Sequence, residues 1–463
     1  MKYISTRGGI SPIEFQDAVM MGLADDGGLV IPESIPCVAG RLAELARLSY
    51  PELAYEILHL FATDIPQKDL HDIVTRTYNP QAFEGGVAPV VPVGDVFIQE
   101  LWHGPTLAFK DVALQLLGNL FEYVLAHRGG RLNILGATSG DTGSAAIYGV
   151  RGKAGINIFI MHPAGRVSPI QERQMTSVLD GNVHNIAVDG SFDDCQNIMK
   201  TLSADLDFKR KYSLGAVNSV NWARVLAQVV YYFSGVFDVQ RATGAKTVRI
   251  AVPTGNFGDV LAGWYAVKMG LPVSKLILAT NENDILARFF NTGRYSIGKV
   301  FQTLSPSMDI QVASNFERYL YYRLGSDAVK LKNIMDEFAQ KGSLSVLPAD
   351  GGIDGDFISS SANCGQVIEV IRRHFERYGY LLDPHTACGV VAAEKSGIGG
   401  EPVICLATAH PAKFPAAIAE ATGDASLATH PRIEKLMDME TRCVKLPGDR
   451  QAVRRFIIET LGE

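Results

Sequence analysis

The segment KTVRIAVPTGNFGDVLAGWYAVKMG, residues Lys246–Gly270, carries the pattern that decides the fold. Its first part, Val248–Val252, is mainly apolar without alternation, as expected for a strand that is covered on both faces of a parallel sheet. A polar loop with two glycines follows at Pro253–Asp259, and the apolar residues after it fit a helix. Strand, polar loop and helix in this order are the repeating unit of α/β proteins.

The same unit recurs along the chain. The apolar run RLNILGA precedes TSGDTG, and similar runs occur in GINIFIMHP, SKLILATNEND and EPVICLATAHP. This repetition predicts an α/β fold with parallel sheets. Because ligands of such folds bind at the carboxyl ends of the strands, we expect the functional residues in the polar loops.

Length and composition narrow the class of protein. The chain has 463 residues, 47% hydrophobic and 20% charged, and a formal net charge of −6, which argues against nucleic acid or a membrane surface as the main partner. No apolar run approaches the ~18 residues of a membrane span. Six scattered cysteines and an N-terminus without an apolar signal core predict reduced thiols and a cytoplasmic protein.

Two loops are suited to bind anions. In PTGNFGD, Gly255 and Gly258 permit close backbone approach, and amides at a helix start can hold a phosphate; a plain tight turn explains the loop equally well. In TSGDTG, hydroxyls, glycines and helix amides could hold a carboxylate. There Asp141 would oppose an anion unless it bonds another group, and Asp141 or Thr142 could instead cap the helix.

Two further loops give weaker signals. In NSVNWAR, Asn221 and Arg224 share a helix face and could bind phosphate oxygens, although a surface arginine and a packing Trp222 are the alternative. In LATAHPAKF, the hydroxyl of Thr408 at a strand end could bond a ligand's ring nitrogen, or simply end the strand. No zinc or calcium spacing is present, so no metal site is expected.

Lys110 in HGPTLAFKD follows three apolar residues. Partial desolvation there would lower the pKa of its amine and make it a nucleophile, whereas most lysines are simply surface residues. A desolvated amine, a phosphate loop and a carboxylate loop together are what a pyridoxal phosphate enzyme requires.

At this point several motifs match one family in register. The segments STRGG, DAVMMGLADDGGLVIP, ELWHGPTLAFKDVALQ, GATSGDTGSAA, NSVNWAR, VPTGNFGD and ATAHPAKFP resemble threonine synthases of the longer bacterial and fungal type. The resemblance covers nearly the whole chain.

The resemblance implies a fold-type II pyridoxal phosphate enzyme, similar to the tryptophan synthase β-subunit, with two parallel-sheet domains and a mainly helical N-terminal extension. The extension would be residues 1–85, the larger cofactor-binding domain 86–129 plus 225–463, and the smaller domain 130–224.

It also implies roles for individual residues. Lys110 would carry the internal aldimine, and Thr408 would face the pyridine nitrogen. The cofactor phosphate would lie on Gly255, Asn256, Phe257, Gly258 and Asp259. The substrate carboxylate would lie on Ser139, Gly140, Asp141 and Thr142, and the substrate phosphate on Asn218, Asn221 and Arg224.

The implied reaction converts O-phospho-L-homoserine and water to L-threonine and phosphate by γ-elimination and β-hydration, the last step of threonine biosynthesis. A monomer or homodimer is expected. Two alternatives stay open: a related phospho-lyase that releases 2-oxobutyrate, and a non-catalytic binding protein built on the same fold.

Overall fold

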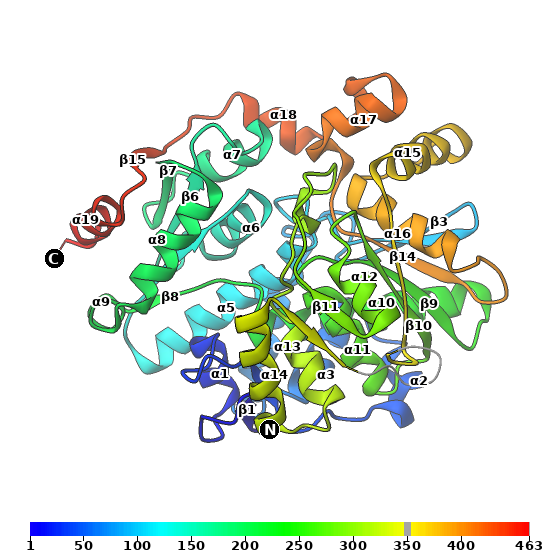
Figure 1. Cartoon of the computed structure of the whole chain (residues 1–463), viewed down its shortest axis with the longest axis horizontal. Helices are drawn as coiled ribbons and strands as arrows, with labels where there is room; N and C mark the ends of the chain where they lie inside the picture. The colour runs from blue at the N-terminus through cyan, green and yellow to red at the C-terminus, as the bar shows by residue number, and fades with distance from the viewer. Residues whose placement is uncertain (347–352, 463) are drawn as a thin grey trace.

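The computed structural model describes residues 1–346 and 353–462, which form two lobes, each built on a sheet (Figure 1). The larger sheet has six strands in the order β13-β10-β9-β14-β4-β3. All neighbours in it are parallel except the edge pair β3 and β4. Its strands are β3 (Val90–Val93), β4 (Val96–Glu100), β9 (Val248–Pro253), β10 (Val273–Thr280), β13 (Phe357–Ser361) and β14 (Val403–Ala407).

The smaller sheet has five strands, all parallel, in the order β15-β7-β6-β5-β8. Its strands are β5 (Leu132–Ala137), β6 (Ile156–Pro163), β7 (Val183–Asp189), β8 (Leu214–Gly215) and β15 (Val444–Pro447). The prediction of an α/β protein with two parallel-sheet units is therefore confirmed, with one antiparallel edge strand in the larger unit.

Helices cover both sheets. Those of the smaller lobe are α6 (Asp141–Val150), α7 (Pro169–Thr176), α8 (Phe192–Ala204), α9 (Leu206–Lys211) and α19 (Arg450–Leu461). Those of the larger lobe are α10 (Trp222–Thr243), α11 (Gly258–Lys268), α12 (Ile285–Thr292), α13 (Phe316–Arg323), α14 (Ala328–Lys341), α15 (Cys364–Tyr378), α16 (Pro384–Lys395) and α17 (Pro415–Thr422). Helix α5 (Lys110–Arg128) contacts both α6 and α10, so it joins the lobes.

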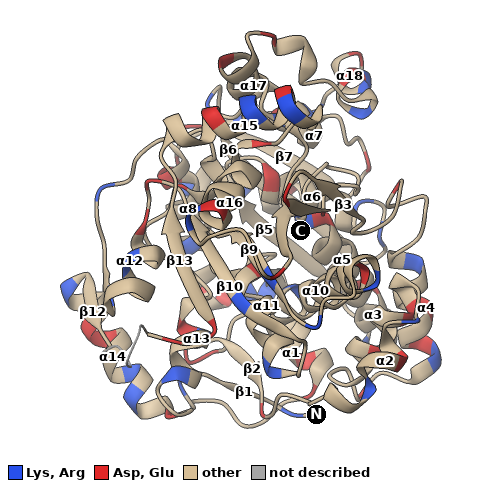
Figure 2. Ribbon diagram, turned by 90° about the vertical axis from the view of Figure 1, so that its right-hand side faces the viewer, with Lys and Arg blue, Asp and Glu red and all other residues tan. Residues whose placement is uncertain are grey.

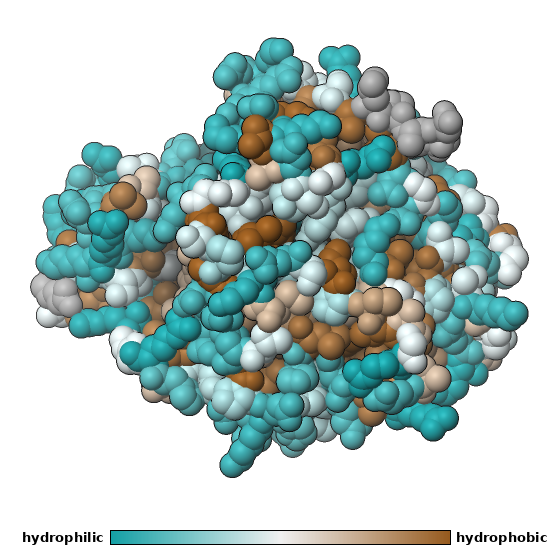
Figure 3. Space-filling model, turned by 90° about the horizontal axis from the view of Figure 1, so that it is seen from below, coloured by the Kyte–Doolittle hydropathy of each residue, from teal (hydrophilic) through white to brown (hydrophobic). Residues whose placement is uncertain are grey.

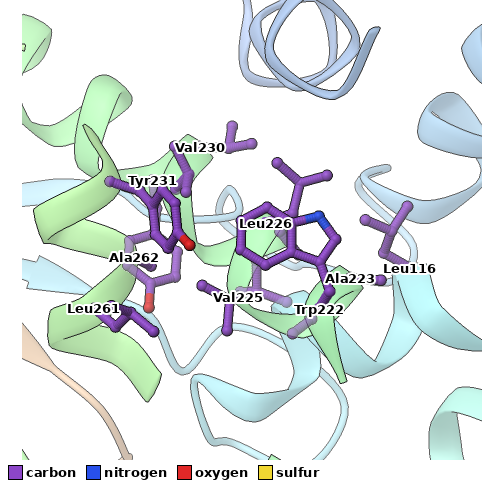
Figure 4. Close-up of a cluster of buried hydrophobic side chains, with 14 of the residues drawn as sticks. Leu116, Trp222, Ala223, Val225, Leu226, Val230, Tyr231, Leu261 and Ala262 are labelled. Atoms are coloured by element: carbon purple, nitrogen blue, oxygen red, sulfur yellow. The ribbon is translucent and has the colours of Figure 1, made fainter. Parts of the chain in front are cut away.

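The N-terminal extension is mainly helical, as predicted. It consists of β1 (Tyr3–Ser5), α1 (Phe15–Met21), β2 (Val30–Pro32), α2 (Leu42–Leu45), α3 (Tyr50–His59) and α4 (Gln67–Thr77). Helix α3 packs on α10 and α4 packs on α5. Figure 4 shows part of the core, where the side chains of Trp222, Leu226 and Tyr231 of α10 lie between Leu261 of α11 on one side and Leu116 of α5 on the other.

The C-terminal segment crosses between the lobes. After α17, the chain passes through α18 (Pro431–Met437) and β15 to α19, across the top of the view in Figure 1. Strand β15 pairs with β7 of the smaller sheet, whereas the sequence analysis assigned the whole of residues 225–463 to the larger domain. The short strand VKLP has no local feature that indicates its partner, because pairing between distant segments depends on the tertiary fold.

The remaining elements are short. They are the pair β11 (Arg294–Ser296) and β12 (Ser343–Ser345) and the 3₁₀ turns η1 (Ala39–Arg41), η2 (Pro306–Met308), η3 (Pro411–Lys413) and η4 (Ala425–Leu427). Charged residues lie mainly on the outer helices and loops (Figure 2), and hydrophilic residues cover most of the face seen in Figure 3. No helix in the described part of the chain combines the length and apolar character that a membrane crossing needs.

Candidate active site

Lys110 is the first residue of α5, at the end of a tightly held loop. The buried Leu107 in this loop has a φ of 58°, in the left-handed region that few non-glycine residues adopt. Asp111 stabilises the loop by accepting hydrogen bonds of 2.8 Å from the backbone N–H and the hydroxyl of Thr106. The Phe109 N–H donates to the Thr408 carbonyl at 2.9 Å, which brings the end of β14 beside Lys110.

The Lys110 amine lies in a largely enclosed place, with 12% of the side chain exposed. Its Nζ is 3.4 Å from Asp141 Oδ2 and 3.4 Å from Ser307 Oγ. Burial lowers the pKa of Lys110, the nearby Asp141 opposes this, and the cations of Lys413 and Arg224 lower it further. The predicted desolvation of this lysine is therefore present, and it favours the neutral, nucleophilic amine.

Asp141, at the start of α6, is the acceptor around which the site is assembled. Its Oδ1 accepts from Lys413 Nζ at 2.7 Å and from Gln171 Nε2 at 2.8 Å, and its Oδ2 accepts from Ser307 Oγ at 3.0 Å. Burial alone raises the pKa of Asp141, but the ammonium groups of Lys413 and Lys110 outweigh burial and hold the pKa well below its usual range.

Ser139 and Gly140 lie in the short connection between β5 and α6, and Asp141 and Thr142 are the first two residues of that helix. Neither Asp141 nor Thr142 caps α6; instead, the hydroxyl of Thr138 accepts from the N–H groups of Gly140 and Gly143 at 3.0 and 2.9 Å. Ser139 is exposed. Since the charge of Asp141 is already paired with lysines, it does not prevent an anion from approaching the loop.

The loop between β9 and α11 approaches the same place from the larger lobe. A Cβ added to Gly255 would lie 2.8 Å from the carbonyl oxygen of Ser307, so only glycine fits under this turn. Phe257 has a φ of 62° and places Gly258 at the start of α11, whose first N–H groups have no acceptor within the helix. Such N–H groups form an anion site.

Two side chains of this loop turn away from that site. The Phe257 ring is 1% exposed and packs among other rings, including Phe290 and Phe316. The Asp259 carboxylate accepts from the hydroxyls of Tyr231 and Tyr232 at 2.5 and 2.8 Å, and burial raises its pKa to about 6. If these residues hold a phosphate, they do so through their backbone N–H groups.

Within the segment Asn218–Arg224, some polar side chains are unpaired and others stabilise the fold. Arg224 is 4% exposed, and its Nε and Nη1 have no hydrogen-bond acceptor among the described residues. The same holds for Asn218 Oδ1, which lacks a donor there. Asn221 is used structurally, because it caps α10 through the Ala223 N–H at 3.0 Å and donates to the Val19 carbonyl at 2.8 Å. Arg224 and Asn218 are therefore available to a ligand, and the Asn221 side chain is committed to the fold.

Ser314 and Asn315 connect this segment to the β9–α11 loop. Asn315 Nδ2 donates to the carbonyls of Ser219 and Asn256 at 3.1 and 3.2 Å. The Ser314 hydroxyl lies 2.8 Å from Ser219 Oγ and 3.3 Å from Asn256 Oδ1. The segment Asn218–Arg224 and the β9–α11 loop are thus held at a defined separation.

Sequence reasoning missed several members of the site. They are Ser307, Lys413, Gln171, Ser314 and Asn315. The segment TLSPSMD, which contains Ser307, has the hydroxyls and the proline of a functional loop, and Lys413 lies inside the quoted motif ATAHPAKF. Neither feature indicates by itself that the residue faces Asp141.

The donors and the amine fit pyridoxal phosphate. Lys110 supplies a desolvated amine for an aldehyde, the start of α11 supplies N–H donors for a phosphate, and Gly255 leaves space for close approach. The orphaned guanidinium of Arg224 indicates a further anionic ligand, since buried donors are almost always paired.

Three protein families match consecutive parts of the chain. The family described as "Threonine synthase N terminus" matches residues 2–78, "Pyridoxal-phosphate dependent enzyme" matches residues 86–352, and "Threonine synthase, C-terminal" matches residues 386–457. Together they span most of the chain, and the second covers the segments that carry Lys110, Asp141 and Arg224.

Individual relatives agree with this. The chain is 46% identical to a threonine synthase of Methylobacillus glycogenes, over 99% of this chain and 100% of that protein. It is 46% identical to a threonine synthase of Saccharomyces cerevisiae, over 90% of this chain and 88% of that protein. A "threonine synthase-like 2" of Mus musculus is 36% identical, over 100% of this chain and 98% of that protein.

Solved structures agree as well. A threonine synthase from Brucella melitensis, solved with pyridoxal phosphate bound, superposes with a TM-score of 0.95 at 43% identity, covering 100% of both chains. The yeast threonine synthase superposes with a TM-score of 0.94 at 42% identity, covering 99% of this chain and 98% of that chain. The chain belongs to the threonine synthase family of pyridoxal phosphate-dependent enzymes.

Proposed function

We propose that this protein converts O-phospho-L-homoserine and water to L-threonine and phosphate, with Lys110 as the residue that bonds the cofactor and moves protons. The observation that carries the proposal is the placement of the Lys110 amine, desolvated and 3.4 Å from both Asp141 Oδ2 and Ser307 Oγ. Burial favours the uncharged, nucleophilic form of this amine, and its place beside Asp141 and Ser307 would keep it close to the reacting carbons of a bound substrate.

Pyridoxal phosphate, when bound, stabilises negative charge next to the amino group of the substrate. Lys110, as a neutral amine, accepts the proton from Cα of the substrate and serves as general base and acid again at Cβ. Asp141 stays ionised beside it, so the carboxylate orients the amine and stabilises the ammonium that forms.

Two segments bind the two anionic groups of the substrate. The N–H groups and hydroxyls of Ser139–Thr142 bind the carboxylate, and the unpaired Arg224 guanidinium with Asn218 binds the phosphate that leaves from Cγ. A cation at the leaving oxygen stabilises the charge that develops as the bond breaks. In the cofactor site, the backbone N–H groups of Gly255–Asp259 would hold the phosphate group, and Thr408 would face the pyridine nitrogen.

We place the enzyme in the cytoplasm, where its six unpaired cysteines stay reduced, as a monomer or homodimer. We also propose three domains: an N-terminal extension of residues 1–85, a larger domain of residues 86–129 plus 225–463, and a smaller domain of residues 130–224. Strand β15 is the exception, because it pairs with β7 of the smaller sheet.

The test is turnover of O-phospho-L-homoserine with threonine, phosphate and 2-oxobutyrate all quantified. We expect a yellow holoenzyme that forms threonine and phosphate in equal amounts, and a colourless, inactive Lys110→Ala variant. Reduction with borohydride should attach the cofactor to the peptide that contains Lys110. A protein that never binds pyridoxal phosphate would overturn the proposal.

A phospho-lyase is the second candidate function, because the same side chains could release 2-oxobutyrate before water adds. The comparisons favour the first function, because the relatives at 46% identity named above are threonine synthases. If 2-oxobutyrate is the main product, the lyase is correct and the hydration step is not.

A further inference from the structure

A second lysine is buried beside Lys110 and has no place in the reaction described above. Lys413 ends the short turn η3 after β14, and its side chain is 0% exposed. Its Nζ lies 2.7 Å from Asp141 Oδ1 and donates to the Thr106 carbonyl at 2.9 Å. A fully buried lysine is rare unless it is paired, so the pairing of Lys413 with Asp141 indicates that its charge has a specific electrostatic function.

The two contacts of Lys413 join the segments on either side of Lys110. Thr106 belongs to the loop that leads into α5, and its carbonyl also accepts from Gln174 Nε2 at 2.9 Å. Asp141 begins α6 in the smaller lobe. One ammonium group therefore ties the loop before Lys110 to the carboxylate that faces the Lys110 amine.

The charges around Lys110 come from several elements. Asp141 on α6, Lys413 on η3 and Arg224 on α10 act on Lys110 directly. His385 on α16 acts on Asp141, and Asp111 on α5 is influenced by Lys413. Within this set, Asp141 and Lys413 form the closest ion pair, at 2.7 Å, and their charges cancel.

We propose that Lys413 is a positioning residue for Lys110, which anchors Asp141 and offsets its charge so that the Lys110 amine faces a neutral ion pair rather than a lone carboxylate. Without Lys413, Asp141 would have Lys110 as its main cationic partner and would hold that amine protonated. With Lys413 in place, Asp141 still orients the amine through the 3.4 Å contact but binds the ammonium form less strongly. This inference rests on the proposed role of Lys110 as the amine that bonds the cofactor.

The test measures the Lys110 amine directly in the full-length protein without cofactor. Acetylation by a trace of acetic anhydride is followed over a pH series, and the extent at Lys110 is read by mass spectrometry of its peptide. We expect Lys413→Met to shift the labelling curve of Lys110 to higher pH by about 1 unit or more, because the uncompensated carboxylate favours the ammonium form. Asp141→Asn should shift the curve the other way, and the double variant should lie between the two.

Lys330→Met is the matched control, since Lys330 is exposed on α14 in the larger lobe and should leave the Lys110 curve unchanged. Should Lys413→Met fail to fold because Asp141 is left unpaired, the comparison of Asp141→Asn with the double variant replaces it. In that background Lys413 acts on Lys110 only through the repulsion between two cations, and its removal should still move the curve to higher pH. A Lys110 curve that does not respond to loss of Lys413 in either background overturns the proposal.

The outcome is separable from that of the proposed reaction, because labelling requires neither cofactor nor substrate. Suppose that the wild type forms threonine but that loss of Lys413 leaves the labelling of Lys110 unaltered. That result would contradict only the positioning role of Lys413. A wild type that forms no threonine, with the expected labelling shifts, would contradict only the proposed reaction.

Discussion

The Tyr231 hydroxyl donates a hydrogen bond of 2.5 Å to Asp259 Oδ1 in the core between α10 and α11. Tyr232 donates to the same oxygen at 2.8 Å, and Asp259 Oδ2 has no donor among the described residues. The carboxyl at the start of α11 therefore serves the packing of α10 against α11. Burial, only partly offset by the two hydroxyls, raises its pKa to about 6.

This carboxyl should make the stability of the fold depend on pH. Since the pKa of Asp259 is higher in the folded chain than the usual ~3.9 in an unfolded one, its contribution to stability is complete below about pH 4 and is lost as pH rises through 6. The shift corresponds to about 3 kcal/mol. We expect Asp259→Asn to gain stability relative to wild type as the pH rises from about 4 to 6, with a constant difference above that range, as measured by urea unfolding. Asp25→Asn, a change at an exposed position, should show the same pH dependence of stability as the wild type. A stability difference between Asp259→Asn and wild type that is the same at every pH would contradict the prediction.

Arg224 should matter for the phosphorylated substrate and little for folding. Replacement by methionine removes a buried guanidinium with two unpaired nitrogens, so the free energy of unfolding of the substrate-free holoenzyme should be unchanged or higher. Loss of the cation should lower kcat/KM for O-phospho-L-homoserine about 100-fold or more. Steady-state kinetics test this, with Arg241→Met, exposed on the same helix, as the control. If both variants have the same kcat/KM, Arg224 does not bind the substrate phosphate.

Asn315 should contribute more than its neighbour Ser314 to the stability of the fold and to the binding of cofactor and substrate. Its side chain is 0% exposed, donates to the Ser219 and Asn256 carbonyls, and accepts from Arg318 Nη1 at 2.6 Å. Asn315→Ala leaves these buried groups unpaired, so the free energy of unfolding should fall by about 3 kcal/mol, with weaker binding of both cofactor and substrate. Ser314→Ala, at a half-buried position, should cost about 1 kcal/mol or less. Chemical unfolding and cofactor titration measure both effects, and similar losses in the two variants would argue against this difference.

Gly255→Ala should weaken cofactor binding by about tenfold or more, because the new methyl group would have to displace the Ser307 carbonyl 2.8 Å away. Ser307 would then move from its contact with Lys110. The measurement is the dissociation constant for pyridoxal phosphate from quenching of protein fluorescence. Gly181→Ala provides the control, since an added Cβ there meets nothing within 4 Å. Unchanged affinity in Gly255→Ala would mean that the turn adapts and does not limit the site.

Much of the fold could be predicted because its signals are local. The apolar runs at β9, β5, β10 and β14, each followed by a polar loop, are visible in the sequence, and these loops do lie at the ends of their strands. The desolvation of Lys110 also follows from its immediate neighbours. By contrast, the assignment of Phe257 and Asp259 to a phosphate site could not reveal that both side chains point into the core, since the direction of a side chain in a turn depends on the helices that pack against it.

The sequence by itself thus determined the class of fold, the family and the polar loops at the strand ends, because strand patterns, glycine turns and motifs act over short distances. Only the tertiary structure decided which partners meet in those loops. It brought Ser307 and Lys413 to Asp141, bonded the Asn221 side chain to the Val19 carbonyl, and added β15 to the smaller sheet. These contacts join segments that are far apart in the chain, and their geometry depends on how the two lobes pack around α5.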